Sequence, residues 1–284
     1  MPLAGRRAGL QSPPPRHGRE IRGVTLWIGT SGWQYAHWRG KLYERGLPMS
    51  RWFDRYAEGF DTVELNVTFY RQPRPAVFEA WSRRAPDDFL FAVKASRFLT
   101  HIKRLREPGD SVDRLMEGAS RLGKHLGPIL VQLPPDMEAV PDRLEETLAA
   151  FPPTVRVTVE PRHRSWFTPE VREVLGRHGA ALCWADRRGP RTPVDRDWAT
   201  APWGYVRFHA GSALPPGCYG EIALRRWLER VRDAWPDPSQ DVFLYWNNDP
   251  RGCAPRDAGW FAELARRARL DVSRAPDPSA LPVG

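Results

Sequence analysis

The sequence is poor in cysteine and has no long apolar run. Its 284 residues include three cysteines, Cys183, Cys218 and Cys253. The number is odd and no pair has CxxC spacing, so the sequence predicts neither a disulfide framework nor a zinc knuckle, and a reducing cytoplasm is the expected location. No apolar stretch approaches the roughly 18 residues that a membrane-spanning helix needs. We therefore expect a soluble protein with no membrane partner.

Lysine is also scarce, with four residues against 39 arginines, although the formal net charge is +9. This skew is typical of coding bias and does not indicate a track of phosphate-binding side chains. Residues 1–23 hold five arginines and one acidic residue, Glu20, and so contribute +4 of the charge. The stretch is rich in Pro and Gly and lacks the apolar core of a signal peptide, which predicts a disordered tail outside the functional unit.

From Val24 to Leu270, short apolar segments alternate with amphipathic ones. Strand candidates begin at residues 24, 62, 89, 128, 155, 180, 203 and 241, and helix candidates cover 50–59, 75–85, 111–126, 141–151, 168–178, 221–234 and 256–269. Eight such units predict one α/β domain over residues 24–270, a (β/α)8 TIM-type barrel with an irregular sixth connection at 187–202. Residues 271–284 are expected to be a disordered tail.

A doubly wound open sheet is the alternative fold. Such a sheet has fewer strands and often a glycine-rich phosphate-binding turn after the first one. The segment GTSGW at 29–33 matches neither the dinucleotide fingerprint nor the P-loop, and Trp33 stands where a GxSxG elbow has its last glycine. The barrel is therefore the favoured architecture.

Strand parity is the most informative pattern in the sequence. In a barrel one parity of each strand faces the helices and the other faces the interior. If the purely apolar parity faces the helices, polar side chains point inward near the carboxyl ends of the strands, where barrel enzymes build their sites. These residues are Glu64, Asn66, Lys94, Gln132, Glu160, Arg162, Arg207, His209 and Asn247. The alternative is a neutral structural plug, in which Glu64 and Glu160 balance Lys94 and Arg207.

Several ordered motifs resemble the YecE-like family, known as domain of unknown function 72. They include GTSGWQYAHWRGKLY at 29–43, VELNVTFYRQP at 63–73, LGPILVQLPP at 126–135, VEPRHRSWF at 159–167, YVRFHAG at 205–211 and YWNNDPRGCA at 245–254. The resemblance runs from Val24 to about Ala265 and implies a TIM-type barrel whose activity is not established. Pro161 and Ala210 depart from the expected pattern, but neither departure removes a polar site residue.

The polar interior provides five catalytic candidates, Glu64, Lys94, Glu160, Arg207 and His209. Glu160 is the first choice for a general acid or base, because burial can move a carboxyl pKa toward neutrality, although Arg162 or Arg207 would oppose that shift. Arg207 is cast as a clamp for an anionic ligand, and His209 as a proton shuttle or a structural hydrogen-bonding group. Lys94 is either a Schiff-base lysine or, as we favour, an unreactive lysine paired with Glu64 and Glu160.

Further residues are expected to bind the ligand from the loops that follow the strands. Aromatic faces at the mouth are suited to stacking on sugars or bases, and their alternative role is packing against helices. These aromatic residues are Trp33, Tyr35, Trp38, Tyr70 and Trp166. The polar binding candidates are Asn66, His101, Gln132, Arg162, His163, Asp186, Asn247 and Asn248.

These residues lead to three functional hypotheses. The first is an enzyme, a hydrolase, lyase or isomerase, acting on a small anionic or sugar-like ligand, and the others are a nucleic-acid-binding barrel and a non-catalytic ligand-binding barrel. Glu64, Glu160, Asp186, His163 and His209 are residue types that divalent metals prefer, but Lys94 and Arg207 would repel a cation, so no cofactor is indicated. A monomer is the favoured state.

Overall fold

The computed structural model describes residues 26–187, 189, 191–249 and 251–283. Eight parallel strands pair in sequence order and close on themselves through β1 and β8. They are β1 (Leu26–Ser31), β2 (Thr62–Leu65), β3 (Leu90–Lys94), β4 (Leu126–Gln132), β5 (Val157–Glu160), β6 (Ala181–Asp186), β7 (Gly204–Phe208) and β8 (Val242–Trp246). The predicted (β/α)8 barrel is confirmed.

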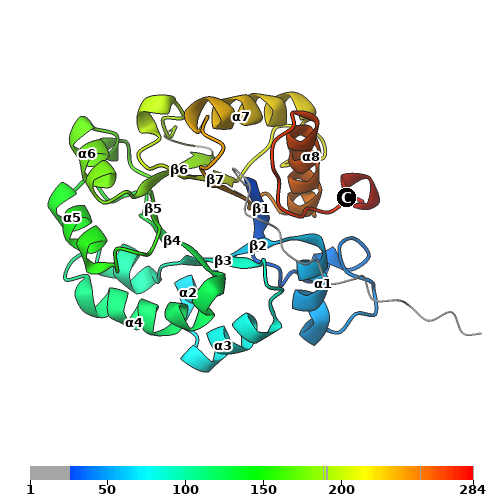
Figure 1. The fold of residues 1–284 in the computed structure, drawn as a ribbon, viewed down its shortest axis with the longest axis horizontal. Coiled ribbons are helices and arrows are strands. Elements are labelled where there is room, and N and C mark those ends of the chain that lie inside the picture. The colour runs from blue at the N-terminus through cyan, green and yellow to red at the C-terminus, as the bar shows by residue number, and fades with distance from the viewer. Residues whose placement is uncertain (1–25, 188, 190, 250, 284) are drawn as a thin grey trace, which may run out of the picture.

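Helices form an outer ring around the strands (Figure 1). The α-helices are α1 (Trp52–Gly59), α2 (Val67–Tyr70), α3 (Pro75–Arg84), α4 (Gly109–Ala119), α5 (Pro141–Ala150), α6 (Pro169–Arg177), α7 (Glu221–Ala234) and α8 (Cys253–Arg267). Three of them, α3, α5 and α6, start at a proline, whose missing N–H is no loss in the first turn.

Short helical turns occupy several of the connections. The 3-10 turns are η1 (Ala36–Trp38), η2 (Met49–Arg51), η4 (Ser120–His125), η5 (Arg164–Trp166), η6 (Arg196–Trp198) and η7 (Pro278–Ala280), and η3 (Phe98–Ile102) is a π-helix. Within the described part of the β6–β7 connection, η6 is the one helical element. The predicted irregularity of the sixth connection is therefore confirmed.

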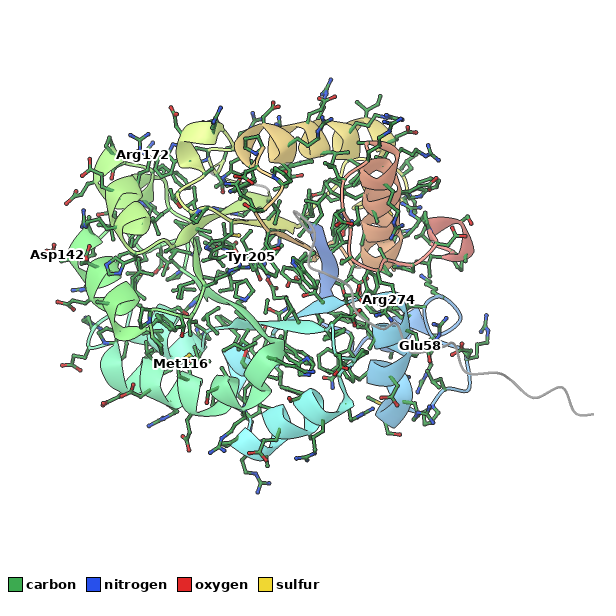
Figure 2. All side chains as sticks on the ribbon, in the orientation of Figure 1. Glu58, Met116, Asp142, Arg172, Tyr205 and Arg274 are labelled. Carbon is green, nitrogen blue, oxygen red and sulfur yellow. A yellow bond between two sulfur atoms is a disulfide. The ribbon has the colours of Figure 1, made fainter. Side chains whose placement is uncertain are left out.

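The barrel interior has an apolar layer below the charged strand ends. Tyr205 and Tyr245 lie within it beside the small side chains of Ala92, Ala181 and Cys183. Figure 2 shows Tyr205 inside the ring of strands, whereas Asp142 and Arg172 lie on the outer helices. The apolar layer thus closes the barrel below and leaves the carboxyl ends of the strands as the place for polar groups.

The C-terminal segment differs from the sequence expectation. Residues 271–273 lie alongside the start of β1, where the Leu26 N–H donates to Asp271 O at 3.0 Å and the Ile28 N–H donates to Ser273 Oγ at 2.9 Å, and η7 packs against α8. Arg274 also pairs with the carboxylate of Asp61. These contacts satisfy the outer end of β1, so the segment is part of the packed domain. The tail predicted over residues 1–23 lies outside the described residues.

Two of the three cysteines form a disulfide, so the expectation of unpaired cysteines was wrong for them. Cys218 lies in the connection after β7 and Cys253 begins α8, with their Cα atoms 5.2 Å apart. They are 35 residues apart in the sequence, and the adjacency of β7 and β8 in the barrel brings them together. Cys183 is free and buried inside the barrel.

No helix in the described part of the chain combines the length and the hydropathy that crossing a membrane requires.

Candidate functional site

Three charged side chains meet at the centre of the barrel mouth. Arg207, from β7, donates through Nη1 to Glu160 Oε2 at 2.5 Å and through Nη2 to Glu64 Oε1 at 2.8 Å. The Tyr205 hydroxyl donates to the other oxygen of Glu64 at 2.7 Å. Glu64 and Glu160 are 0% exposed and Arg207 is 1% exposed. The parity prediction is thus correct for strands β2, β5 and β7, which bring these groups together from distant parts of the sequence.

Glu160 remains ionised in this setting. Gln132 Nε2 donates to its carboxylate at 2.8 Å and Arg162 Nε at 3.2 Å, in addition to Arg207. Burial alone would raise the pKa of Glu160, but Arg207, His209 and Arg162 outweigh it and hold the pKa well below its usual range. The expected shift toward neutrality is therefore reversed, because three donors stabilise the charged form. A carboxylate held in this state is a poor general acid and a weak base.

Arg207 does not act as a free anion clamp. Both of its terminal nitrogens are already engaged by Glu64 and Glu160, and its Nε is buried without a partner among the described residues. Burial lowers and the two carboxylates raise its pKa, with the net result well above the usual value. Arg207 is thus the counterion that allows two carboxylates to be buried.

Lys94 contrasts with the expected ion-paired lysine. It lies at the end of β3 with 7% of its surface exposed, and its Nζ sits 4.0 Å from the centre of the Phe69 ring. No described carboxylate forms an ion pair with it, because Glu64 and Glu160 turn toward Arg207. Burial, followed by the repulsion of Arg207, lowers the pKa of Lys94 to about 8. A substantial fraction of its amine is therefore uncharged near neutral pH.

His209 presents an unengaged ring nitrogen to the same mouth. The amide Nδ2 of Asn247 lies 3.1 Å from His209 Nδ1, so Nδ1 accepts and the neutral ring carries its proton on Nε2. This Nε2 is buried without a hydrogen-bond partner among the described residues and lies 3.7 Å from Glu160 Oε1. Burial and then Arg207 lower the pKa of His209 to about 4, which keeps the ring neutral at physiological pH.

His101 is within electrostatic range of Lys94, and Asn66 precedes the helix α2 that carries Phe69. His101 belongs to the π-helix η3, its Nδ1 is 2.9 Å from Thr100 Oγ1, and its ring packs edge-on against Phe69 with 5.0 Å between centres. Burial and then Lys94 lower its pKa to about 4. Asn66 caps the start of α2, and its Oδ1 is buried with no partner among the described residues. The Phe69 ring thus separates Lys94 from the π-helix.

The stacking role predicted for the mouth aromatics is wrong for the tryptophans. Trp33, Trp38 and Trp166 are all buried in the core between strands and helices. The Trp38 and Trp166 indoles donate to Asp249 Oδ1 and to a backbone carbonyl, each at 2.8 Å, which is a packing role. The loops that carry these tryptophans turn the indole rings into the core, and strand spacing does not predict the direction in which a loop side chain points.

The two tyrosines of that set differ from each other. The Tyr35 hydroxyl donates to the Ser31 carbonyl oxygen at 2.5 Å, and burial followed by Asp249 raises the pKa of Tyr35 to about 12. It is therefore a structural group at the end of β1. Tyr70 is 80% exposed at the end of α2, so its ring keeps a free face for a ligand.

Three predicted binding residues instead tie loops to the outer layer. Asp186 Oδ2 accepts from the Tyr219 hydroxyl at 2.8 Å, away from the lumen. Asn248 donates to a carboxylate of α8 at 2.7 Å, and His163 Nδ1 lies 2.8 Å from the hydroxyl of Ser165 at the start of η5. These side chains shape the rim and do not face the charged centre.

Two features of the mouth had no counterpart in the sequence interpretation. Asp249, which follows β8, contacts both His37 Nε2 at 2.5 Å and the Trp38 indole, and so joins the first loop to the last. Its position in the loop after β8, which ends at Trp246, was the available signal. The second feature is Phe69, which covers Lys94 and looks like an ordinary core residue in the sequence.

The predicted metal-ligand types do not converge. In the part of the chain that the structure describes, the one set of His, Cys, Asp and Glu atoms close enough to share a metal is Cys218, Cys253 and Asp257. The two sulfurs of that set are bonded to each other. At the strand ends, Glu64 and Glu160 have Arg207 between them where a metal would have to lie.

The mouth carries an excess of positive charge. Lys94, Arg162, Arg187 and Arg207 interact with the two carboxylates Glu64 and Glu160, which leaves a formal balance of +2 when Lys94 is protonated. Beside the mouth, a cavity of about 420 Å³ lies between α2, η3 and α4, lined in part by Phe69, Tyr70 and Arg97. The arrangement is therefore suited to a small anion at the strand ends.

Comparisons with known proteins place the chain among uncharacterised relatives. Residues 27–281 match the family model described as "Protein of unknown function DUF72". The chain is 27% identical over 245 residues to the UPF0759 protein YecE of Escherichia coli K12, covering 78% of this chain and 86% of that protein. It is 24% identical over 273 residues to the UPF0759 protein YunF of Bacillus subtilis, covering 84% and 94% of the two chains.

The fold is shared with solved structures of the same family. A DUF72 family protein from Thermotoga maritima superposes with a TM-score of 0.74 and 27% identity, over 85% of this chain and 99% of that one. A second, from Enterococcus faecalis, gives a TM-score of 0.71 at 16% identity, over 85% and 96%.

Proposed function

Because the chain belongs to the DUF72 family, whose function is unknown, we propose its activity from the geometry of the barrel mouth: it is an enzyme that acts on a small anionic ligand. The single observation that supports this most strongly is Lys94, a buried amine at a strand end that forms no ion pair with any carboxylate of the described residues. A purely structural barrel gains nothing from such a group, since burying an unpaired charge costs stability. Buried ionisable groups with shifted pKa values mark functional sites.

In this proposal Lys94 and His209 are the groups that act on the ligand. An uncharged Lys94 amine is a base or a nucleophile, and the His209 Nε2–H is a donor with no partner among the described residues. Arg162 contributes positive charge at the rim, where its side chain is 29% exposed. Glu64, Glu160 and Arg207 form the rigid floor that sets the field at these groups, and Glu160 is not the proton-transfer group.

The test compares Lys94→Met with Lys124→Met, an equal change of charge at an exposed site in η4, the turn that precedes β4. Each protein is incubated with an extract of anionic metabolites, and mass spectrometry records which compounds are consumed. We expect at least one anion to be consumed by the wild type and by Lys124→Met but not by Lys94→Met. Equal consumption by all three proteins would contradict the proposal.

Binding separates an enzyme from a non-catalytic barrel. Oxalate, titrated calorimetrically at low salt, is expected to bind the wild type and to bind Arg162→Gln about tenfold more weakly, since one charge-assisted contact contributes about 1.5–3 kcal/mol. Arg226→Gln, on the exposed face of α7, is the control for net charge. Oxalate binding without any consumption of metabolites would favour the non-catalytic barrel.

Nucleic-acid binding is a second candidate, supported by one observation. The exposed Tyr70 ring borders a cavity that Arg97, Lys103 and Arg114 also line, which combines a stacking face with positive charge. The burial of Trp33 and Trp38 removes the other predicted stacking faces. Binding of a single-stranded oligonucleotide that weakens steeply with salt and is lost in Tyr70→Ala would support this candidate.

A further inference from the structure

The four lysines of this chain have different surroundings. Lys103 and Lys124 each pair with a carboxylate, at 3.1 Å and 2.7 Å, and Lys41 donates to a backbone carbonyl at 2.7 Å. Lys94 forms no ion pair with a described carboxylate, and its Nζ lies 4.0 Å from the centre of the Phe69 ring. Lys103 also lies over a ring, that of Phe98 at 5.9 Å, but it is paired with Glu107. An ammonium over a ring keeps part of its stabilisation, but the ring accepts no proton and forms no ion pair. Of the four lysine amines, that of Lys94 is therefore the one best placed to react with a ligand.

The charged groups that face Lys94 keep its amine unpaired. Glu64 and Glu160 are within electrostatic range, but both are directed to Arg207, whose charge opposes theirs. Arg162 and His101 complete the surroundings, one cationic and one neutral near pH 7. With a pKa of about 8, roughly a tenth of the Lys94 amine is uncharged at pH 7, against far less than a hundredth for an ordinary lysine.

The electrophile that suits this amine is a carbonyl carbon. A phosphoryl or acyl transfer needs a stabiliser for its leaving group or its oxyanion, whereas a carbonyl reacts with an amine without any other protein group. The cationic rim supplied by Arg162 provides a place for a carboxylate next to that carbonyl. We infer that the substrate is a small oxo acid and that Lys94 Nζ forms a Schiff base with its carbonyl carbon, an inference that rests on the proposed function.

The step balances without any further reactant. The nitrogen of Lys94 attacks the carbonyl carbon and forms a C–N bond, while the carbonyl oxygen takes up one of the two amine protons and becomes a hydroxyl group. The second amine proton then joins this hydroxyl group as the C–O bond breaks, so that one water molecule leaves and a C=N bond remains. When the imine nitrogen is protonated, its positive charge lies where the Lys94 ammonium lay, within range of Glu64 and Glu160. Such an iminium withdraws electrons from the neighbouring carbon, the activation used by Schiff-base enzymes.

The experiment traps the imine in the full-length protein. Glyoxylate, the smallest oxo acid, is added at pH 7 with cyanoborohydride, and proteolytic mapping by mass spectrometry follows N-carboxymethylation at each of the four lysines. We expect Lys94 to be modified about tenfold faster than the exposed Lys124, because more of its amine is free while burial slows its access. Acetaldehyde, which lacks the carboxylate, should lose most of that preference.

The outcomes separate this inference from the proposed function. Modification of Lys94 no faster than that of Lys124 would overturn the inference. If glyoxylate fails but oxalate still binds and loses affinity in Arg162→Gln, the anion site stands and the carbonyl chemistry alone is wrong. If neither compound interacts with the mouth, both proposals fail. Arg226→Gln should label like the wild type, whereas Arg162→Gln should lower the preference for glyoxylate over acetaldehyde.

Discussion

Two sides of the barrel mouth each bury a cationic side chain, and they shift its pKa in opposite directions. On the side of β2, β5 and β7, Arg207 lies between two carboxylates, which raise its pKa well above the usual value. On the side of β3, Lys94 is almost as buried, yet it forms no ion pair with a carboxylate in the part of the chain that the structure describes, and its pKa falls to about 8. Burial therefore does not decide the state of an ionisable group, because the direction in which nearby carboxylates point decides it. The first side is a structural floor, and the second holds the amine that we propose reacts with the substrate.

Removing the cation from the structural side should have the largest effect. In Arg207→Met, Glu64 and Glu160 would remain buried without a counterion, and breaking a buried ion pair in this way costs about 3–5 kcal/mol. The free energy of unfolding, measured in urea, should fall by at least that amount, or the protein should not fold. A loss below about 1 kcal/mol, as is usual for exposed positions, would show that the two carboxylates do not depend on Arg207.

Removing the cation on the side of β3, Lys94, should change the free energy of unfolding in the opposite direction. The charged form of Lys94 is destabilised by burial in the folded protein, so Lys94→Met should raise the free energy of unfolding at pH 7 by about 1–3 kcal/mol. The exposed control Lys124→Met should change it by less than about 0.5 kcal/mol. A destabilised Lys94→Met would mean that the amine has a stabilising partner after all.

Acid should weaken the fold through His209 in a window set by its pKa. The folded pKa is about 4, below the ordinary value near 6.5, so the neutral ring stabilises the fold above pH 6.5 and this contribution is lost as the pH falls toward 4. Glu160, Glu64, Arg162 and Arg207 face the ring, and both carboxylates stay ionised over most of this window because their pKa values are lowered.

A variant at His209 distinguishes the contribution of this side chain to the pH dependence of stability from those of other titratable groups. His209→Gln should flatten the dependence of the unfolding free energy on pH between about 6.5 and 4.5, although the lowered pKa of His101 leaves some slope. Urea unfolding at a series of pH values measures this. An unchanged slope would show that the folded protein binds a proton at His209 as readily as the unfolded chain does.

The sequence predicted the strands and their inward faces because both follow from local rules. Alternation with a period of two places Glu64, Lys94, Glu160 and Arg207 on one parity, and parallel strands bring those ends to one edge. The helix ranges follow from amphipathic spacing and from prolines at helix starts. Strands, inward faces and helix ranges can therefore be predicted without knowing which side chains contact one another.

The pairing within the mouth could not be predicted in this way. Four charged residues allow several combinations, and the choice of Arg207 over Lys94 as partner of both carboxylates depends on the reach of each side chain across the lumen. Trp38 and the Cys218–Cys253 pair were missed for a related reason, since loops that follow neighbouring strands bring together residues far apart in the sequence.

Titration of Lys94 measures whether its buried amine lacks a counterion, as the described residues indicate. Protein labelled with 13Cε-lysine gives signals from four lysines, and Lys94→Met assigns the one of interest. We expect the titration midpoint of the Lys94 amine to be about 8. A midpoint in the ordinary lysine range, near about 10.4, would contradict it, because only a nearby anion would keep so buried an ammonium charged at that pH.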